Sequence, residues 1–73
     1  MMEENIWSEL RYEETAENIV NVFGWLTGEL DETGIAIIEI NVLTGFVTYL
    51  DERAKDDLYA QEAVQEVFEI YGL

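Results

Sequence analysis

The sequence predicts a small α+β domain in which an antiparallel β-hairpin packs against two amphipathic helices, in the order α-β-β-α. Three patterns support this fold: apolar residues at helical spacing in residues 12–27, two β-branched runs within residues 35–50, and a second helical pattern in residues 51–71. A chain of 73 residues has room for one domain, residues 1–73, and 49% of its residues are hydrophobic, so it should fold rather than stay disordered.

The first predicted helix covers residues 12–27. Its apolar positions recur at steps of three and four, which is typical of one stripe of a helix. These positions are Tyr12, Ala16, Ile19, Val20, Phe23 and Leu26. Glu13, Glu14 and Glu17 fall on the opposite side. Residues 4–11 fit either an additional helical turn or an alternating strand, and we favour the helix.

Two β-strands are predicted at residues 35–42 and 46–50, because both runs are rich in β-branched and aromatic residues. The intervening Leu-Thr-Gly fits a three-residue hairpin loop that pairs Val42 with Phe46. This register places one set of side chains in the core: Ala36, Ile38, Ile40, Val42, Phe46, Thr48 and Leu50. The other face is mixed, and its residues are Ile35, Ile37, Glu39, Asn41, Val47, Tyr49 and Asp51.

The closing helix is predicted to run from Asp51, a suitable N-cap, to Gly72. Its apolar stripe is formed by Ala54, Leu58, Val64, Val67, Phe68 and Tyr71. At about 100° per residue, the acids gather on the far side, at Glu52, Asp56, Glu62, Glu66 and Glu69. Asp57 points toward the apolar side, so an alternative start lies near Asp56 or Asp57, with residues 51–55 in a turn.

Acidic residues dominate the composition. Seventeen Asp and Glu stand against three Lys and Arg, which gives a formal net charge of −14. Such a surface repels nucleic acid and anionic membranes and attracts basic proteins. The chain has no apolar run of the roughly 20 residues that span a membrane and no basic segment at its start, so we expect a cytoplasmic protein. Adaptation to high salt is an alternative cause of the acidity. Salt-adapted proteins tend to be rich in Asp, however, whereas the acids of this chain are mostly Glu.

The sequence offers little for catalysis or metal binding. It contains no His and no Cys, and Ser8 is its single serine, so neither a Ser-His nor a Cys-His nucleophile can form. Paired carboxylates are abundant, but so small a domain has little room for a pocket that would raise the pKa of one of them. The segment from Asp51 to Glu62 has the length of a calcium loop, yet Arg53 and Lys55 replace oxygen ligands. We therefore predict no enzyme activity, no catalytic residue, no cofactor and no metal site.

The uncompensated acids are the strongest functional signal. Few Lys or Arg residues offset the repulsion between like charges on the predicted helices. We predict a partner-binding surface formed by Glu13, Glu14, Glu17, Glu52, Asp56, Glu62, Glu66 and Glu69, together with Trp25. Trp25 falls off the apolar stripe, where it would either anchor an interface or cover the edge of the sheet.

In size, charge and lack of catalytic residues, the chain resembles the small acidic inhibitors that phages and mobile elements use against host nucleases, including anti-restriction and anti-CRISPR DNA mimics. The resemblance lies in overall character and is carried by the acids named above. It implies a protein that blocks the basic DNA- or RNA-binding surface of a host nuclease, or of its complex, in the host cytoplasm, without binding nucleic acid itself. The alternative is a homodimeric adaptor that pairs through the mixed face of its sheet and whose acids keep it soluble.

Overall fold

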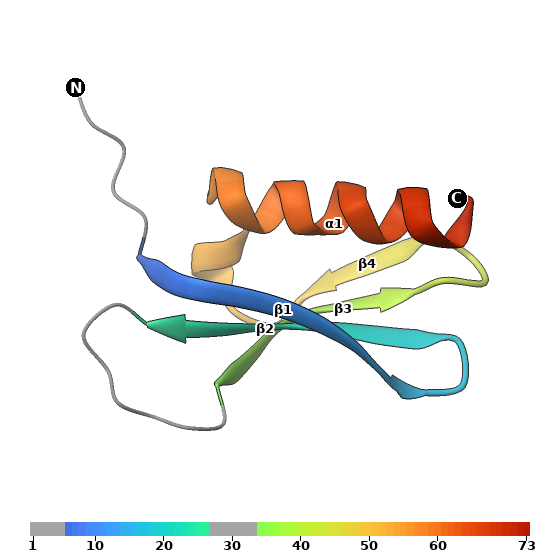
Figure 1. The fold of residues 1–73 in the computed structure, drawn as a ribbon, viewed down its shortest axis with the longest axis horizontal. Helices are drawn as coiled ribbons and strands as arrows, with labels where there is room; N and C mark the ends of the chain where they lie inside the picture. The colour runs from blue at the N-terminus through green and yellow to red at the C-terminus, as the bar shows by residue number, and fades with distance from the viewer. Residues whose placement is uncertain (1–5, 27–33) are drawn as a thin grey trace.

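The computed structural model describes residues 6–26 and 34–73. Within these ranges the chain forms a four-stranded antiparallel sheet and one α-helix, with the strand order β1-β2-β3-β4 (Figure 1). The strands are β1 (Trp7–Ala16), β2 (Ile19–Leu26), β3 (Ile35–Asn41) and β4 (Phe46–Tyr49), followed by a 3-10 turn, η1 (Glu52–Ala54), and the helix α1 (Leu58–Tyr71). Each strand therefore lies beside the next one along the chain.

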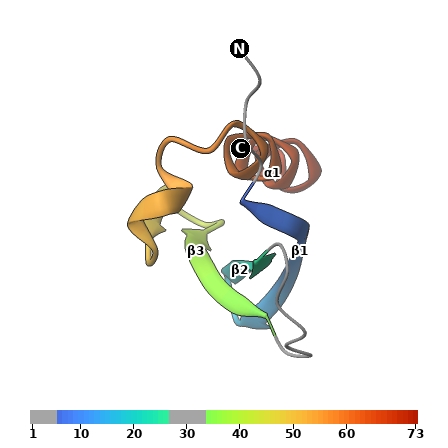
Figure 2. The same cartoon turned by 90° about the vertical axis from the view of Figure 1, so that its left-hand side faces the viewer.

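The helix covers one face of the sheet. The view along the helix axis places α1 above β1, with η1 on the opposite side of the molecule from β1, beside β3 (Figure 2). The side chains buried between the two layers are Trp7, Val20, Val22, Ile37, Ile38, Ile40, Ala54, Ala60, Val64 and Val67. The opposite face of the sheet carries no helix among the described residues, so it is open (Figure 1).

The prediction of two amphipathic helices is wrong, because residues 12–26 belong to a β-hairpin. β1 and β2 pair along most of their length, and the chain turns between them at Glu17 and Asn18. Asn18 has a φ of 63°, in the left-handed region that asparagine tolerates better than most residues. The helical spacing of this segment coincides with a second pattern, in which Val20 and Val22 alternate onto the covered face and are fully buried. β-branched and aromatic residues favour the strand.

β1 begins at Trp7, so the helix favoured for residues 4–11 is also wrong where these residues are described. Trp7 pairs with Leu26 and Glu9 pairs with Trp25, which leaves Ser8 as an extra residue in the strand. The Ser8 hydroxyl donates a hydrogen bond to the carbonyl oxygen of Trp25, at 3.1 Å. This bond ties the irregular end of β1 to its neighbour.

The β3–β4 hairpin is confirmed, but its register differs from the prediction by one residue. Phe46 pairs with Asn41 rather than with Val42, and the loop spans four residues ending at Gly45, whose φ is 82°. A shift of one residue exchanges the two faces of a strand. Thus Val47 and Tyr49 pack toward the core, while Phe46 is 70% exposed.

β3 contains a bulge that changes which of its residues are buried. Val22 pairs with Ile38 and Phe23 pairs with Ala36, which leaves Ile37 as the extra residue. Ile37 and Ile38 are therefore both fully buried although they are consecutive. The prediction that Ile38 and Ile40 lie in the core is correct, and the placement of Ile37 on the opposite face is wrong.

The closing helix is confirmed, and of its two predicted starts the structure has the one near Asp57. α1 begins at Leu58, and the Asp57 side chain accepts a hydrogen bond from the amide of Ala60 at 2.9 Å, as an N-cap does. Gly72 ends the helix with a φ of 73°. Asp51 instead caps η1, by accepting a hydrogen bond from the amide of Arg53. The described part of the chain contains no helix with the length and apolar character needed to cross a membrane.

Candidate protein-binding surface

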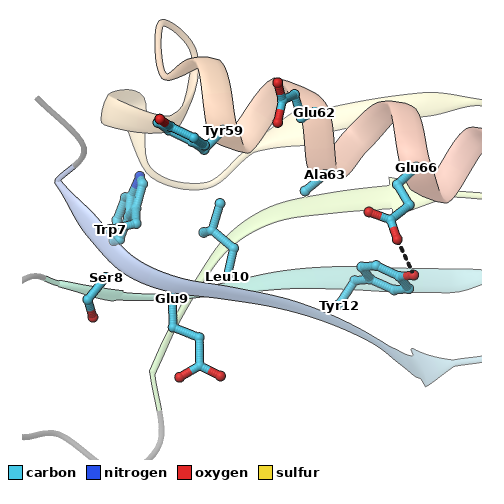
Figure 3. Close-up of a pocket in the computed structure, with 9 residues that line it drawn as sticks. All are labelled: Trp7, Ser8, Glu9, Leu10, Tyr12, Tyr59, Glu62, Ala63 and Glu66. Atoms are coloured by element: carbon cyan, nitrogen blue, oxygen red, sulfur yellow. Dashed lines mark hydrogen bonds between the residues drawn. The ribbon is translucent and has the colours of Figure 1, made fainter. Parts of the chain in front are cut away.

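A cavity of about 260 Å³ lies between β1 and α1 (Figure 3). Its walls are Trp7, Ser8, Glu9, Leu10 and Tyr12 from β1, and Tyr59, Glu62, Ala63 and Glu66 from α1. Aromatic and aliphatic side chains thus form much of the lining, while carboxylates come from both elements. This volume is below the roughly 300 to 1,000 Å³ of pockets for drug-sized molecules, so the cavity fits a side chain better than a cofactor.

Trp7 anchors the strand side of this cavity. It is only 1% exposed, and the Arg53 guanidinium lies 5.3 Å from the centre of its ring. Gly24 lies against the same ring, since a Cβ atom at this position would be 2.7 Å from Trp7 Cε3. The glycine is required here because no side chain fits between β2 and the indole.

A hydrogen bond from Tyr12 to Glu66 joins the two walls of the cavity. The Tyr12 hydroxyl donates to Glu66 Oε2 at 3.1 Å, across 54 positions of sequence (Figure 3). Partial burial of Tyr12 raises its pKa, and the hydrogen bond and the negative charge of Glu66 raise it further. Tyr12 therefore stays protonated at neutral pH and acts as a donor that orients the carboxylate.

The predicted acidic residues of α1 lie on its surface. Glu62, Glu66 and Glu69 are all exposed. Glu66 points down toward Tyr12, and Glu62 lies at the rim of the cavity on the upper side of the helix (Figure 3). On β1, the exposed Glu9 points away from the helix (Figure 3) and forms an ion pair with Arg11. The acidic margin of the aromatic cavity is therefore formed by α1.

The structure separates the other predicted acids from this cavity. Glu13 and Glu14 are successive residues of β1, so their side chains lie on opposite faces of the sheet rather than on one helical stripe. Glu17 lies in the β1–β2 turn. Glu52 belongs to η1 and Asp56 precedes α1. The prediction that both extend the row of acids on the helix is therefore wrong. All five are exposed.

Trp25 lies on the open face of the sheet and is half-buried. The Arg11 guanidinium sits 5.5 Å from the centre of its ring. The backbone of Gly34 packs against the indole of Trp25, since a Cβ atom at Gly34 would lie 2.8 Å from the ring. The indole is therefore partly covered by its own chain, and it lies on the other face of the sheet from α1.

Sequence reasoning missed three aromatic residues of the cavity, namely Trp7, Tyr12 as a strand residue, and Tyr59. For Tyr12, the alternation with Leu10 was the available signal, since both residues line the cavity from one strand. For Tyr59 no such signal exists, because its role depends on the packing of α1 over β1. The cavity is thus a tertiary feature.

Few cations neutralise the carboxylates. Among the described residues, two ion pairs form, Arg11 with Glu9 and Arg53 with Asp51. No group of three or more residues in the described ranges is arranged to hold a metal ion. The site can therefore attract and pair with cationic groups, and the lining offers no histidine or thiol for nucleophilic chemistry.

Comparisons with known proteins give no relative for this chain: no protein-family model, no curated protein and no solved structure matches it.

Proposed function

We propose that this protein is a non-enzymatic inhibitor that binds a basic DNA- or RNA-binding surface of another protein, such as a defence nuclease, by presenting carboxylates in place of phosphates. The observation that carries the proposal is the lack of internal neutralisation. Glu62, Glu66 and Glu69 are exposed on a regular helix, and none of them forms an ion pair with a described residue. Their attraction for cations is therefore directed outward.

The spacing of these acids supports the proposal. At a rise of about 1.5 Å per residue, Glu62, Glu66 and Glu69 follow one another at axial steps of about 6 and 4.5 Å. Nucleic-acid-binding proteins display Lys and Arg against a phosphate backbone of similarly dense charge. Arginine pairs with a carboxylate as it does with a phosphate, in a two-pronged arrangement. A rigid helix also keeps these charges in place before binding.

Of the apolar and aromatic residues on which the homodimer alternative was based, only Ile35 is exposed, at 37%. Of the residues proposed for the dimer face, Ile37 is fully buried, and Val47 and Tyr49 pack against the core. Tyr49 also exchanges hydrogen bonds with Gln61 of α1. The net charge of −14 further opposes association of two copies.

Competition with nucleic acid tests the proposal. The protein is immobilised and used at low salt to capture a basic protein from its native host. The captured protein is then purified, and its binding to a labelled DNA or RNA duplex is followed by fluorescence anisotropy. We expect the acidic protein to displace the duplex, and its own affinity to fall about tenfold or more between about 50 and about 300 mM salt. A captured protein that keeps its duplex at saturation would contradict the proposal.

Two variants of equal charge locate the surface. The first reverses the helix acids, with Glu62→Lys, Glu66→Lys and Glu69→Lys, and should abolish displacement while the circular dichroism spectrum is retained. The matched control reverses three exposed acids away from α1, with Glu17→Lys, Glu52→Lys and Asp56→Lys. The control should retain most of the activity. Equal losses would show that net charge alone, and not the helix, determines binding.

A further inference from the structure

The outer edge of β1 is exposed along most of its length. β1 is the first strand of the sheet and pairs only with β2 among the described strands. From Ser8 to Ala16, no backbone hydrogen bond outside the sheet involves β1 within the described ranges. The amide and carbonyl groups of this stretch that face the outer edge are therefore available to another strand. The cavity beneath α1 opens beside the same edge (Figure 3).

We propose that this edge and the cavity form one groove, into which the basic partner inserts an extended segment that pairs with β1 as a fifth strand and places an arginine in the cavity. The inference rests on the proposed function and specifies how the partner is held. Addition of a strand to an exposed edge is a general mode of peptide recognition, in which the main chain supplies affinity and side-chain pockets supply selectivity.

The cavity suits a guanidinium group. Tyr12 lies beside Glu66 at one end of the cavity and Tyr59 lies at the other end (Figure 3), and a planar guanidinium stacks favourably on such a ring. The Glu66 carboxylate is held in place by the Tyr12 hydroxyl at 3.1 Å. An ionised carboxylate can accept about four hydrogen bonds, so Glu66 retains acceptor capacity for a guanidinium. Ala63 leaves space between these groups.

Charge distinguishes a basic segment from a second copy of this chain. β1 carries Glu9, which pairs with Arg11, and also Glu13 and Glu14, which form no ion pair with a described residue. Pairing of two β1 strands would bring like charges together across the new edge, which destabilises a sheet. A segment rich in arginine would instead meet opposite charges. The second edge of the sheet, β4, has four residues and does not line the cavity, so it offers no equivalent groove.

A short basic peptide tests the groove directly. The probe is a capped peptide of about seven residues in which threonine and arginine alternate, long enough to span about 23 Å as a strand. Its affinity is measured by fluorescence anisotropy, and backbone protection by hydrogen exchange. We expect slower exchange at alternate amides of β1 and no change in β4. Two control peptides of the same charge are N-methylated at alternate residues, one at the odd and one at the even positions. In one of them the methyl groups replace the amide donors that face β1, and this peptide should bind about tenfold more weakly.

Substitutions on α1 complete the test, and the first pair leaves the net charge unchanged. Ala63→Leu fills the space and should weaken the peptide about tenfold, whereas Gln65→Leu, at an exposed position of the same helix, should have no effect. Glu66→Gln keeps an acceptor for Tyr12 but removes the charge, and it should also weaken binding. Circular dichroism verifies that each variant is folded.

Each outcome separates the groove from the proposed function. If Ala63→Leu binds the peptide as the unaltered protein does, or if the amides of β1 gain no protection, the groove is refuted. If Ala63→Leu also displaces nucleic acid from the captured protein normally, the proposed function stands without the groove. If displacement fails for the unaltered protein, the proposed function itself is refuted, and peptide binding then reports only the groove.

Discussion

Two neighbouring rows of residues cross the four strands and give the two faces of the sheet opposite chemistry. The row on the covered face consists of Tyr12, Val22, Ile38 and Tyr49. The adjacent row on the open face consists of Glu13, Asn21, Glu39 and Thr48. The two rows differ by one position along each strand, and the first is apolar and aromatic whereas the second is polar.

This difference explains how so acidic a chain folds. No polar or charged residue is fully buried among the described residues, so the layer beneath α1 carries no uncompensated charge. The exposed acids lie on the open face, along the edge of β1, in the turns and on α1, where Glu66 reaches toward Tyr12. The buried residues that stabilise the fold and the exposed acids therefore alternate along the same strands.

The largest expected effect comes from substitutions that compare the two faces. Ile38→Ala removes a fully buried side chain from the covered face and should lower the free energy of unfolding by about 2 to 5 kcal/mol. Phe46→Ala removes a larger side chain that is 70% exposed, and should change it by less than about 0.5 kcal/mol. Chemical denaturation of both variants measures the difference. Equal costs would show that the register of β4 is not the one described.

A smaller effect on the free energy of unfolding is expected at Gly24, which packs against the indole of Trp7 on the covered face. Gly24→Ala would place its Cβ atom 2.7 Å from Trp7 and should cost about 1 to 3 kcal/mol. Gly45→Ala, in the β3–β4 loop, meets no neighbour within 4 Å and should cost about 1 to 2 kcal/mol from its left-handed φ alone.

A second substitution distinguishes these two causes. In a Trp7→Leu background, Gly24→Ala should lower the free energy of unfolding by less, because the indole that its Cβ atom would contact is absent. The effect of Gly45→Ala should be unchanged. Thermal or chemical denaturation of the two double variants gives the result. An unchanged cost at Gly24 would exclude the contact with Trp7 as its cause.

The smallest expected effect concerns the turn η1 beside the covered face. The Arg53 side chain donates hydrogen bonds to Asp51 and lowers the pKa of that carboxyl group. A lowered pKa in the folded state stabilises the protein fully above the unfolded pKa of about 3.9, and this stabilisation is lost as the pH falls through the folded value. Because the Arg53 side chain is 51% exposed, the contribution should be below about 1 kcal/mol.

The variant Asp51→Asn isolates this charge. It retains an oxygen that can cap η1, so its difference in stability from the unaltered protein should be constant from about pH 7 to 5 and should diminish below about pH 4. Denaturation with urea across this range measures the difference. A difference that persists at low pH would assign the effect to packing rather than to charge.

Much of the second half of the fold could be predicted from the sequence, because its signals are local. The β-branched run that forms β3, the left-handed Gly45 and the helix ended by Gly72 all follow from a few neighbouring residues. The first hairpin could not, because its apolar residues satisfy the spacing of a helix as well as that of a strand. The decisive turn uses Asn18, without the glycine that usually marks a two-residue hairpin loop.

The candidate site divides in the same way. The exposure of Glu62, Glu66 and Glu69 could be predicted, since α1 has a regular period and its buried residues fix its orientation. The cavity could not be predicted, because Tyr12 and Glu66 are separated by 54 positions and meet only through the packing of α1 over β1. Partner-binding roles for these residues remain proposals, as does the role of Trp25.

The position of the cavity has a consequence for the order in which the molecule assembles. Its walls come from β1 and α1, the first and last of the described elements, whereas the four strands pair with their immediate neighbours, which favours rapid formation of the sheet. The cavity therefore exists only once α1 has packed over β1. Detachment of either terminal element would abolish it, so any ligand that occupies it raises the melting temperature of the entire domain by mass action.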